Sequence, residues 1–212
     1  MDDRLATLRK EYGAAELSRK SVDADPIRQF SLWFREAEEA QVPEPNAMTL
    51  STASRTGRPS ARVVLLKDVS PDGFTFFTNY LSRKARELAE NPYASMVFWW
   101  RELERQVRVD GVVERLSGEE SDEYFEVRPR GSQIGAWASP QSEVIDSRSE
   151  LEERVRRIES QFDNHVPRPE FWGGYRLIPD VLEFWQGRES RLHDRILYRR
   201  EDSVWCIERL AP

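Results

Sequence analysis

The stretch MTLSTASRTGRPSARVVLLKDVSPDGFTFFT, residues 48–78, decides the fold. It holds three short segments rich in β-branched and aromatic residues, which is the composition of strands: 48–53, 61–67 and 74–78. The sequences between them, RTGRP and SPDG, carry Gly and Pro where tight turns need them. Strands joined by tight turns pair with their neighbours, so the stretch predicts an antiparallel meander.

Upstream of the meander, the sequence predicts a helix that follows an arm. Asp25 before Pro26 is typical of a helix N-cap and first turn. Apolar residues then recur at helical spacing until about residue 42. Residues 1–24 are polar and weakly patterned. We therefore predict a mobile N-terminal arm at 1–24 and a single domain at 25–212.

Downstream, helices and strands lack the regular βα alternation of a parallel sheet. The expected helices are 82–90, 117–127 and 147–162, with an irregular loop between the last two. The expected strands are 94–100, 106–116, 174–177, 181–186, 191–198 and 204–210. Capping boxes at Ser117 and Ser147 open the last two helices. An α+β chain follows, built on an antiparallel sheet that closes into a barrel.

Composition excludes several classes of function. A net charge of -6 argues against general nucleic-acid binding, which relies on a cationic field. Cys206 stands alone, and no signal-peptide core or long apolar run occurs, so we expect a cytoplasmic protein that does not span a membrane. With one Cys and two His, no metal site is expected, and His165 is expected to be exposed and inert. Dinucleotide, Walker and nucleophile-elbow motifs are absent from the sequence.

Cations gather at two places where local rules disfavour them. Arg83 and Lys84 lie in the first turn of a predicted helix and oppose its dipole, unless an anion binds there; a solvated helix end is the alternative. Arg62 and Lys67 bracket an apolar strand. Residues five apart on a strand point to opposite faces, so we expect these two to serve different ligands or different ends of one site. Protection of a sheet edge by charge is the alternative here.

A third cluster is RLHDR at 191–195. On a strand, Arg191, His193 and Arg195 share one face and repel one another, so we expect something negative opposite them. Carboxylates from elsewhere in the chain are the alternative to a ligand.

A fourth cluster combines a phenol, a guanidinium and a hydroxyl. Tyr124 and Arg128 are one helical turn apart, and Ser132 follows in the expected loop. Such groups can clamp a phosphate, although for these residues alone an exposed helix face is the simpler explanation. Four cationic clusters in an acidic chain predict a protein that binds one or two phosphorylated or carboxylated small molecules, with Trp-rich surroundings able to cover a flat ring.

At these residues the chain resembles the pyridoxine/pyridoxamine 5'-phosphate oxidase family. The resemblance covers nearly the whole length and is carried by long motifs in one order: RKEY at 9–12, RVVLLK at 62–67, SRKA at 82–85, ERQVRV at 104–109, RPRGSQIGAW at 128–137, FWGG at 171–174, EFWQG at 183–187 and RLHDR at 191–195. One departure is Phe77, where the family more often has Tyr.

The resemblance implies an antiparallel split β-barrel with flanking helices that forms a homodimer with two shared FMN sites. It implies that FMN is bound by Arg62, Val63, Val64, Leu65, Leu66, Lys67, Phe77, Thr78, Arg83, Lys84, Gln106, Gln141, Ser142, Trp185 and Arg195. It implies that substrate is bound by Arg9, Lys10, Glu11, Tyr12, Lys67, Tyr124, Arg128, Ser132, Arg191 and His193. Arg191 and His193 are the expected catalytic residues, Arg191 stabilising charge at the reacting carbon and His193 orienting the substrate.

The activity implied is the FMN-dependent oxidation of pyridoxamine or pyridoxine 5'-phosphate to pyridoxal 5'-phosphate. Dioxygen would accept the electrons and yield hydrogen peroxide, with ammonia released from the amine. Two alternatives stay open. A related flavin oxidase acting on another ring, such as a phenazine precursor, should lack the phosphate clamp. A non-catalytic protein that binds FMN or pyridoxal phosphate would show no turnover.

Overall fold

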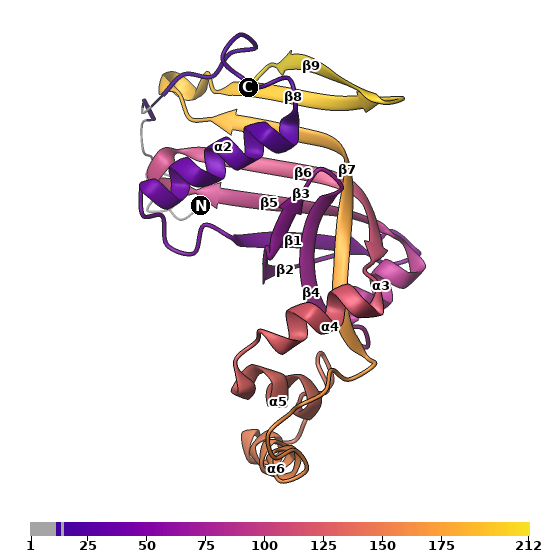
Figure 1. Cartoon of the computed structure of the whole chain (residues 1–212). Helices are drawn as coiled ribbons and strands as arrows, with labels where there is room; N and C mark the ends of the chain where they lie inside the picture. Colours follow the sequence, from indigo (N-terminus) through magenta and orange to yellow (C-terminus); the bar gives the residue numbers. More distant parts are fainter. Residues whose placement is uncertain (1–11, 14) are drawn as a thin grey trace, which may run out of the picture. The chain divides into compact units, whose positions relative to one another are not determined.

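The computed structural model describes residues 12–13 and 15–212, which form an α+β chain (Figure 1). Its helices are α2 (Pro26–Glu39), α3 (Arg83–Glu90), α4 (Gly118–Glu126), α5 (Arg130–Ala138) and α6 (Arg148–Glu159), with short 3-10 turns η1 (Arg101–Leu103) and η2 (Glu189–Arg191). Its strands are β1 (Ala47–Ala53), β2 (Pro59–Leu65), β3 (Asp68–Ser70), β4 (Gly73–Asn79), β5 (Tyr93–Trp100), β6 (Arg105–Arg115), β7 (Trp172–Gln186), β8 (Asp194–Glu201) and β9 (Val204–Leu210). No helix in these described ranges is long and apolar enough to cross a membrane.

The strands form one sheet in the order β2-β1-β5-β6-β7-β4-β3, with β8 paired to β7 and β9 to β8. The pairs β3–β4, β4–β7, β7–β8 and β8–β9 are all antiparallel. Since β3 and β4, and then β8 and β9, are neighbours in sequence as well as in the sheet, much of the pairing is made by hairpins. The predicted α+β class with an antiparallel sheet is confirmed.

Two compact units divide the chain. Unit 1 comprises the described residues up to Thr49 together with Ser95–Gly111 and Pro179–Pro212. Unit 2 comprises Leu50–Ala94 and Val112–Ile178. The boundary expected at residue 24 between an arm and a single domain stays a prediction.

Unit 1 is built on an aromatic core under α2. Asp25 caps this helix as predicted, its carboxylate accepting from the Ile27 N–H at 2.8 Å. The buried Phe30 ring packs edge-on against Phe98 at 5.0 Å between centroids. Trp33 packs in the same way against Phe184 of β7. Burial of these large rings stabilises the helix on its strands far more than helix propensity does.

Unit 2 depends on a close approach of β4 to β7. Phe77 of β4 lies opposite Gly174 of β7, and Asn79 lies opposite Trp172. A Cβ added at Gly174 would lie 2.8 Å from the Phe77 ring and 2.4 Å from Leu116. The glycine is therefore needed for space: it lets an aromatic side chain lie flat over the neighbouring strand.

Helix α5 corrects the loop predicted between residues 128 and 146. Proline and glycine usually interrupt a helix, yet here Pro129 is the N-cap of α5 and Gly131 lies in its first turn. Ser132 is consequently helical. Ile134 and Ala138 are buried in a cluster with Phe125 and Ile158, because α5 packs against α4 and α6 (Figure 1). Tertiary packing outweighs the weak local propensity of this segment.

The C-terminal strands also differ from the prediction. One strand, β7, replaces the two expected around Pro179, because residues before the proline pair with β4 and those after it pair with β8. Strand β8 begins at Asp194, so Arg191 does not share a strand face with His193 and Arg195. Arg191 instead ends η2 with a φ of 62°.

The two capping boxes have different outcomes. Ser117 and Glu120 form the predicted reciprocal pair at the start of α4. At α6, Ser147 accepts from the Glu150 N–H, but the Glu150 carboxylate accepts from the Asp146 N–H and not from the cap residue. The second box is therefore only half formed.

Replacing Gly174 by alanine tests the close approach in unit 2. We expect Gly174→Ala to lower the free energy of unfolding by about 1–3 kcal/mol, because the methyl group overlaps Leu116 and Phe77. Gly135→Ala in α5 is the matched control: its added Cβ meets nothing within 4 Å, and a helical alanine adds about 0.5–1 kcal/mol. Urea unfolding measures both, and equal stabilities of the two variants would contradict the crowding.

Candidate functional site

A cavity of about 490 Å³ opens in unit 2. Its lining contains most of the unit 2 residues that were predicted to bind cofactor or substrate: Arg62, Val63, Val64, Leu65, Lys67, Phe77, Thr78, Lys84, Tyr124, Arg128, Ser132 and Gln141. It also includes Val127, Pro129 and Trp172, which the sequence did not single out as binding residues. A cavity of this size fits a small organic ligand with a phosphate tail.

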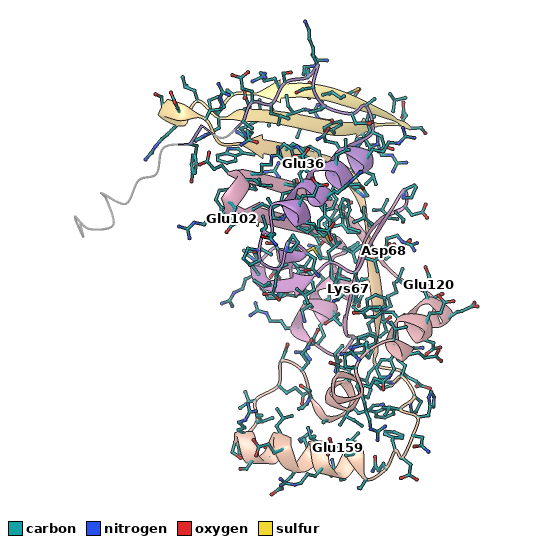
Figure 2. The ribbon with its side chains drawn as sticks, turned by 60° about the vertical axis from the view of Figure 1, so that its left-hand side comes forward. Glu36, Lys67, Asp68, Glu102, Glu120 and Glu159 are labelled. Atoms are coloured by element: carbon teal, nitrogen blue, oxygen red, sulfur yellow. The ribbon has the colours of Figure 1, made fainter. Side chains whose placement is uncertain are left out.

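The lining is cationic. Arg62, Lys67, Lys84 and Arg128 all face the cavity, and no Asp or Glu is among the described residues that line it. Lys67 follows β2 and precedes β3, where Figure 2 labels it beside Asp68. Both residues line this cavity, which is compatible with the expectation that they serve different ends of one site. Strand alternation alone does not set their directions, because β2 ends at Leu65 and does not reach Lys67.

The described residues hold the Lys84 ammonium in this cavity through neutral oxygens. Its ammonium donates to Gln141 Oε1 at 2.8 Å, Thr78 Oγ1 at 3.0 Å and Ser82 Oγ at 3.4 Å. The side chain is buried, and that burial, with the nearby Arg62 charge, lowers the pKa of Lys84 to about 8. An anion in the cavity would restore the lost favourable solvation of this charge. A positive charge at the start of α3 was expected to be unfavourable without an anion, and the lowered pKa of Lys84 agrees with this.

Three stacked rings form one wall of the cavity. Phe77 lies 3.9 Å from Tyr124 and 5.5 Å from Trp172 between centroids, with interplanar angles of 20° and 13°. The Arg128 guanidinium lies over the Trp172 ring, 4.4 Å from its centroid. Lys67 Nζ lies 6.0 Å from the Tyr124 ring. The stack thus fixes the phenol and brings both cations of the predicted phosphate clamp to one place.

Arg128 has an unused buried donor. Its Nη1 has no hydrogen-bond partner among the described residues, and burial lowers the pKa of this guanidinium. Leaving a charged donor unsatisfied costs free energy. A phosphate oxygen is the acceptor that a buried guanidinium fits best, so the cavity has the chemistry of a phosphate site.

Unit 1 carries a second group of predicted residues. Trp185 and His193 lie 4.5 Å apart between ring centroids, and Tyr12 lies 5.8 Å from each. The Arg188 backbone N–H donates to His193 Nδ1 at 3.1 Å. Nδ1 is thus an acceptor, and the neutral imidazole carries its proton on Nε2. Burial and the Arg191 charge both lower the pKa of His193, which favours this neutral form.

Arg195 has a carboxylate partner within the chain, which was the alternative to a bound ligand at the RLHDR cluster. Its Nε and Nη2 bind the two oxygens of Glu183 at 2.6 and 3.1 Å. Arg108 Nη2 lies 3.3 Å from the same buried carboxylate. This bidentate pair raises the pKa of Arg195 and fixes its guanidinium against β7.

The remaining predicted residues have other positions. Leu66 is buried in the core and Ser142 is exposed with a φ of 72°; neither lines the cavity. Arg83 makes an ion pair with Glu87. Gln106 lies in unit 1 on β6. Arg9, Lys10 and Glu11 lie outside the described residues. His165 is exposed, as predicted. No cluster of His, Cys, Asp or Glu that could hold a metal occurs in the part of the chain that the structure describes.

Comparisons with known proteins agree on one family. A family model described as pyridoxamine 5'-phosphate oxidase matches residues 34–162, and one described as the pyridoxine 5'-phosphate oxidase C-terminal dimerisation region matches residues 172–212. A pyridoxine/pyridoxamine 5'-phosphate oxidase of Paraburkholderia phytofirmans is 60% identical over 98% of this chain and 99% of its own. One of Salinibacter ruber is 58% identical over 99% of each.

Solved structures show the same fold. PhzG from Burkholderia lata, in complex with tetrahydrophenazine-1-carboxylic acid, is similar with a TM-score of 0.88 and 32% identity over 94% of this chain and all of its own. A pyridoxamine 5'-phosphate oxidase-related, FMN binding protein from Nostoc punctiforme matches with a TM-score of 0.72 and 18% identity over 90% of this chain and all of its own. The predicted split-barrel fold is confirmed.

Removing the charge of Lys84 tests whether the cavity is built at the expense of stability. The pKa of this lysine is about 8 in the folded chain and about 10.4 when unfolded. The ammonium therefore destabilises the fold below pH 8, and this effect disappears as the pH rises from 8 to 10.4. We expect Lys84→Met to raise the free energy of unfolding at pH 7 by about 1 kcal/mol and to lose that advantage near pH 10.

Lys20→Met is the control for this prediction, because Lys20 is exposed and its removal should change stability little. Urea unfolding of ligand-free protein in phosphate-free buffer at both pH values gives the comparison. A Lys84→Met protein that is less stable than the unaltered protein at pH 7 would contradict the prediction.

Proposed function

Because this chain belongs to the pyridoxine/pyridoxamine 5'-phosphate oxidase family, whose members are oxidoreductases, we propose that it oxidises pyridoxamine and pyridoxine 5'-phosphates to pyridoxal 5'-phosphate. FMN is the proposed cofactor and dioxygen the electron acceptor, with hydrogen peroxide released and, from the amine, ammonia. The observation that carries the proposal is the carboxylate-free cationic cavity, in which Lys84 and Arg128 lack an anionic partner among the described residues. Both the cofactor and the substrate have a phosphate that would complete it.

The FMN phosphate is assigned to the Lys84 side of the cavity. Arg62 and Lys84 supply the positive charge, and Thr78 and Gln141 hold the ammonium in place. When bound, FMN would supply the acceptor for the hydride that leaves the substrate with both electrons of the broken C–H bond. Residues 63–65 line the cavity with backbone and apolar surface that a flat ring system can cover.

The substrate phosphate is assigned to the clamp beside the aromatic stack. Lys67, Tyr124, Arg128 and Ser132 all line the cavity. Two cations, a phenol and a hydroxyl match the charge and the acceptor oxygens of a phosphate ester. Holding the substrate by its tail fixes the distance between the reacting carbon and the flavin, which is the main task left to the protein.

A second copy of the chain is proposed to complete each site. The match of residues 172–212 to a C-terminal dimerisation region supports a homodimer. Trp185, His193 and Arg195 all lie in this segment, and Gln106 lies in the same unit. We assign them to the flavin and substrate held in the cavity of the other copy.

His193 would then act as a hydrogen-bond donor. Its Nδ1 already accepts the Arg188 N–H, so Nε2–H points away from that bond and can orient a substrate oxygen or nitrogen. Arg191 would stabilise negative charge near the reacting carbon. Neither residue needs to remove a proton from carbon, because the bond that breaks gives up its hydrogen as hydride.

Oxidation of a different ring is the second candidate. The likeness to PhzG at 32% identity favours it, since that protein was solved with a tetrahydrophenazine-1-carboxylic acid. Against it stand the complete phosphate clamp in the cavity and the 58–60% identity to pyridoxine/pyridoxamine 5'-phosphate oxidases. A phenazine carboxylate would leave the clamp partly empty.

The direct test is an oxidase assay. Purified protein should take up FMN and turn yellow, and adding pyridoxamine 5'-phosphate in air should produce aldehyde and peroxide in equal amounts. Pyridoxamine without its phosphate should be turned over at least about a hundredfold less efficiently, since it forgoes charge-assisted bonds in the clamp. Equal turnover of both compounds, or failure to bind FMN, would refute the proposal.

Arg191→Ala tests the role assigned to that residue. We expect kcat/KM to fall at least about tenfold, or 1.4 kcal/mol, while FMN stays bound. Arg200→Ala is the control, since Arg200 is an exposed arginine of β8 outside the proposed site. Steady-state kinetics on flavin-loaded protein measures both variants. Unchanged turnover of Arg191→Ala would remove Arg191 from the mechanism.

A further inference from the structure

A buried carboxylate lies behind the cationic wall of the cavity. Glu87 of α3 is 7% exposed and does not line the cavity. Its Oε2 accepts from the hydroxyls of Thr52 and Ser60, both at 2.5 Å, and lies 3.5 Å from Arg62 Nη2. Its Oε1 accepts from Arg83 Nε at 2.9 Å. One carboxylate thus joins two strands, a helix and two arginines: Arg62, which lines the cavity, and Arg83, which the family resemblance assigns to FMN and which does not itself line the cavity.

The hydroxyls of Thr52 and Ser60 link Glu87 to Arg62 through hydrogen bonds of fixed direction. Each hydroxyl has one proton, and both protons are donated to the carboxylate. Their lone pairs therefore face Arg62, whose Nη1 donates to Thr52 at 2.7 Å and whose Nη2 donates to Ser60. The Leu50 carbonyl accepts a further bond from Nη1 at 3.1 Å. Arg62 is held from behind while its side chain lines the cavity.

Glu87 is ionised in this setting. Burial alone would raise its pKa, but the hydrogen bonds from Ser60, Thr52 and Arg83 outweigh burial and lower the pKa to about 2. At neutral pH the carboxylate therefore keeps both hydroxyl protons turned toward itself. A neutral side chain at this position would let either hydroxyl turn its proton toward Arg62 and lose the arrangement.

Two effects of Glu87 on a bound phosphate oppose each other. Its negative charge repels a phosphate dianion through the protein, which would weaken binding. Its hydrogen bonds hold Arg62 and Arg83 in place before the ligand arrives, which removes the cost of ordering two long side chains. The Glu87 carboxylate also offsets the repulsion between the guanidiniums of Arg62 and Arg83.

We propose that Glu87 is a positioning residue for the FMN phosphate, in which the organisation of Arg62 and Arg83 outweighs the repulsion. The inference rests on the proposed function, since it takes FMN as the ligand of this wall of the cavity. It predicts an effect on the phosphate of the cofactor and none on its ring. The comparison of FMN with riboflavin, which has the same ring and no phosphate, isolates that effect.

The experiment titrates ligand-free protein with FMN and with riboflavin, following flavin fluorescence. We expect Glu87→Gln to raise the Kd for FMN at least about fivefold, because charge-assisted bonds to the arginines are lost. The Kd for riboflavin should stay within about twofold. Glu90→Gln, one turn further along α3 and exposed, makes the same charge change and should alter neither constant.

Ser60→Ala is the second variant and keeps the Glu87 charge. It removes one shared hydroxyl, so it should also weaken FMN and spare riboflavin. Combined with Glu87→Gln, its effect should be less than additive, because both changes break one network. This variant decides the matter if Glu87→Gln does not fold.

The outcomes separate the inference from the function on which it rests. FMN bound as tightly or more tightly by folded Glu87→Gln would overturn the positioning role, since repulsion would then dominate. FMN binding unchanged in Ser60→Ala would also overturn it. Unaltered protein that binds FMN no better than riboflavin would overturn the proposed phosphate site itself.

Discussion

The desolvation of positive charge in unit 2 is the constraint on which the rest of the site depends. Lys84 is buried among neutral oxygens and Arg128 keeps a buried donor without a partner among the described residues. A buried ammonium or guanidinium without a counter-charge costs free energy. The chain has carboxylates enough to pair them, as Glu183 pairs Arg195 and Glu87 pairs Arg62. Cations left without a carboxylate mark the places where a ligand brings the negative charge.

The scaffold serves this constraint through packing. The glycine at position 174 lets Phe77 lie flat, and the stack of Phe77 with Tyr124 and Trp172 then fixes the phenol and carries Arg128. Helix α5, packed on α4 and α6, brings Ser132 to the same wall. The clamp is thus supported by a rigid aromatic wall, which suits a site that must hold a small substrate at a fixed distance from a cofactor.

Much of the fold could be predicted from local patterns. The β1–β2 and β3–β4 hairpins, the caps at Asp25 and Ser117, and strand β9 follow from turn residues and alternation. The continuous meander predicted over residues 48–78 is wrong, because β2 pairs with β1 while β4 pairs with β3 and β7, which places β2 and β4 far apart in the strand order. Helix α5 could not be predicted this way, because its glycines and proline are compatible with a helix only once its apolar face is buried. Arg62, Lys67, Lys84 and Arg128 could be singled out from sequence as candidate anion-binding residues, and all four line the cavity.

Contacts between residues far apart in the sequence limited how much of the site could be predicted. Glu183 and Arg195 meet diagonally across the β7–β8 hairpin, where Trp185 lies opposite Arg195. That contact depends on register, which the eleven residues between Glu183 and Arg195 do not encode in an obvious way. The same holds for Glu87, whose partners come from β1 and β2 as well as α3. Sequence showed where the cations lie, and the structure showed which of them have a carboxylate.

In the proposed homodimer, the cavity of unit 2 and the Trp185–Arg195 cluster of unit 1 would be two halves of one flavin site, contributed by different copies of the chain. Subunit complementation between Lys84→Met and Arg195→Met chains tests it most directly. Each variant alone should bind FMN poorly and turn over little. Co-expressed in equal amounts, they should recover about a quarter of the normal sites, because half of the dimers are mixed and one site in each mixed dimer is intact. No recovery in verified mixed dimers would place both residues in a site within one chain and contradict the claim.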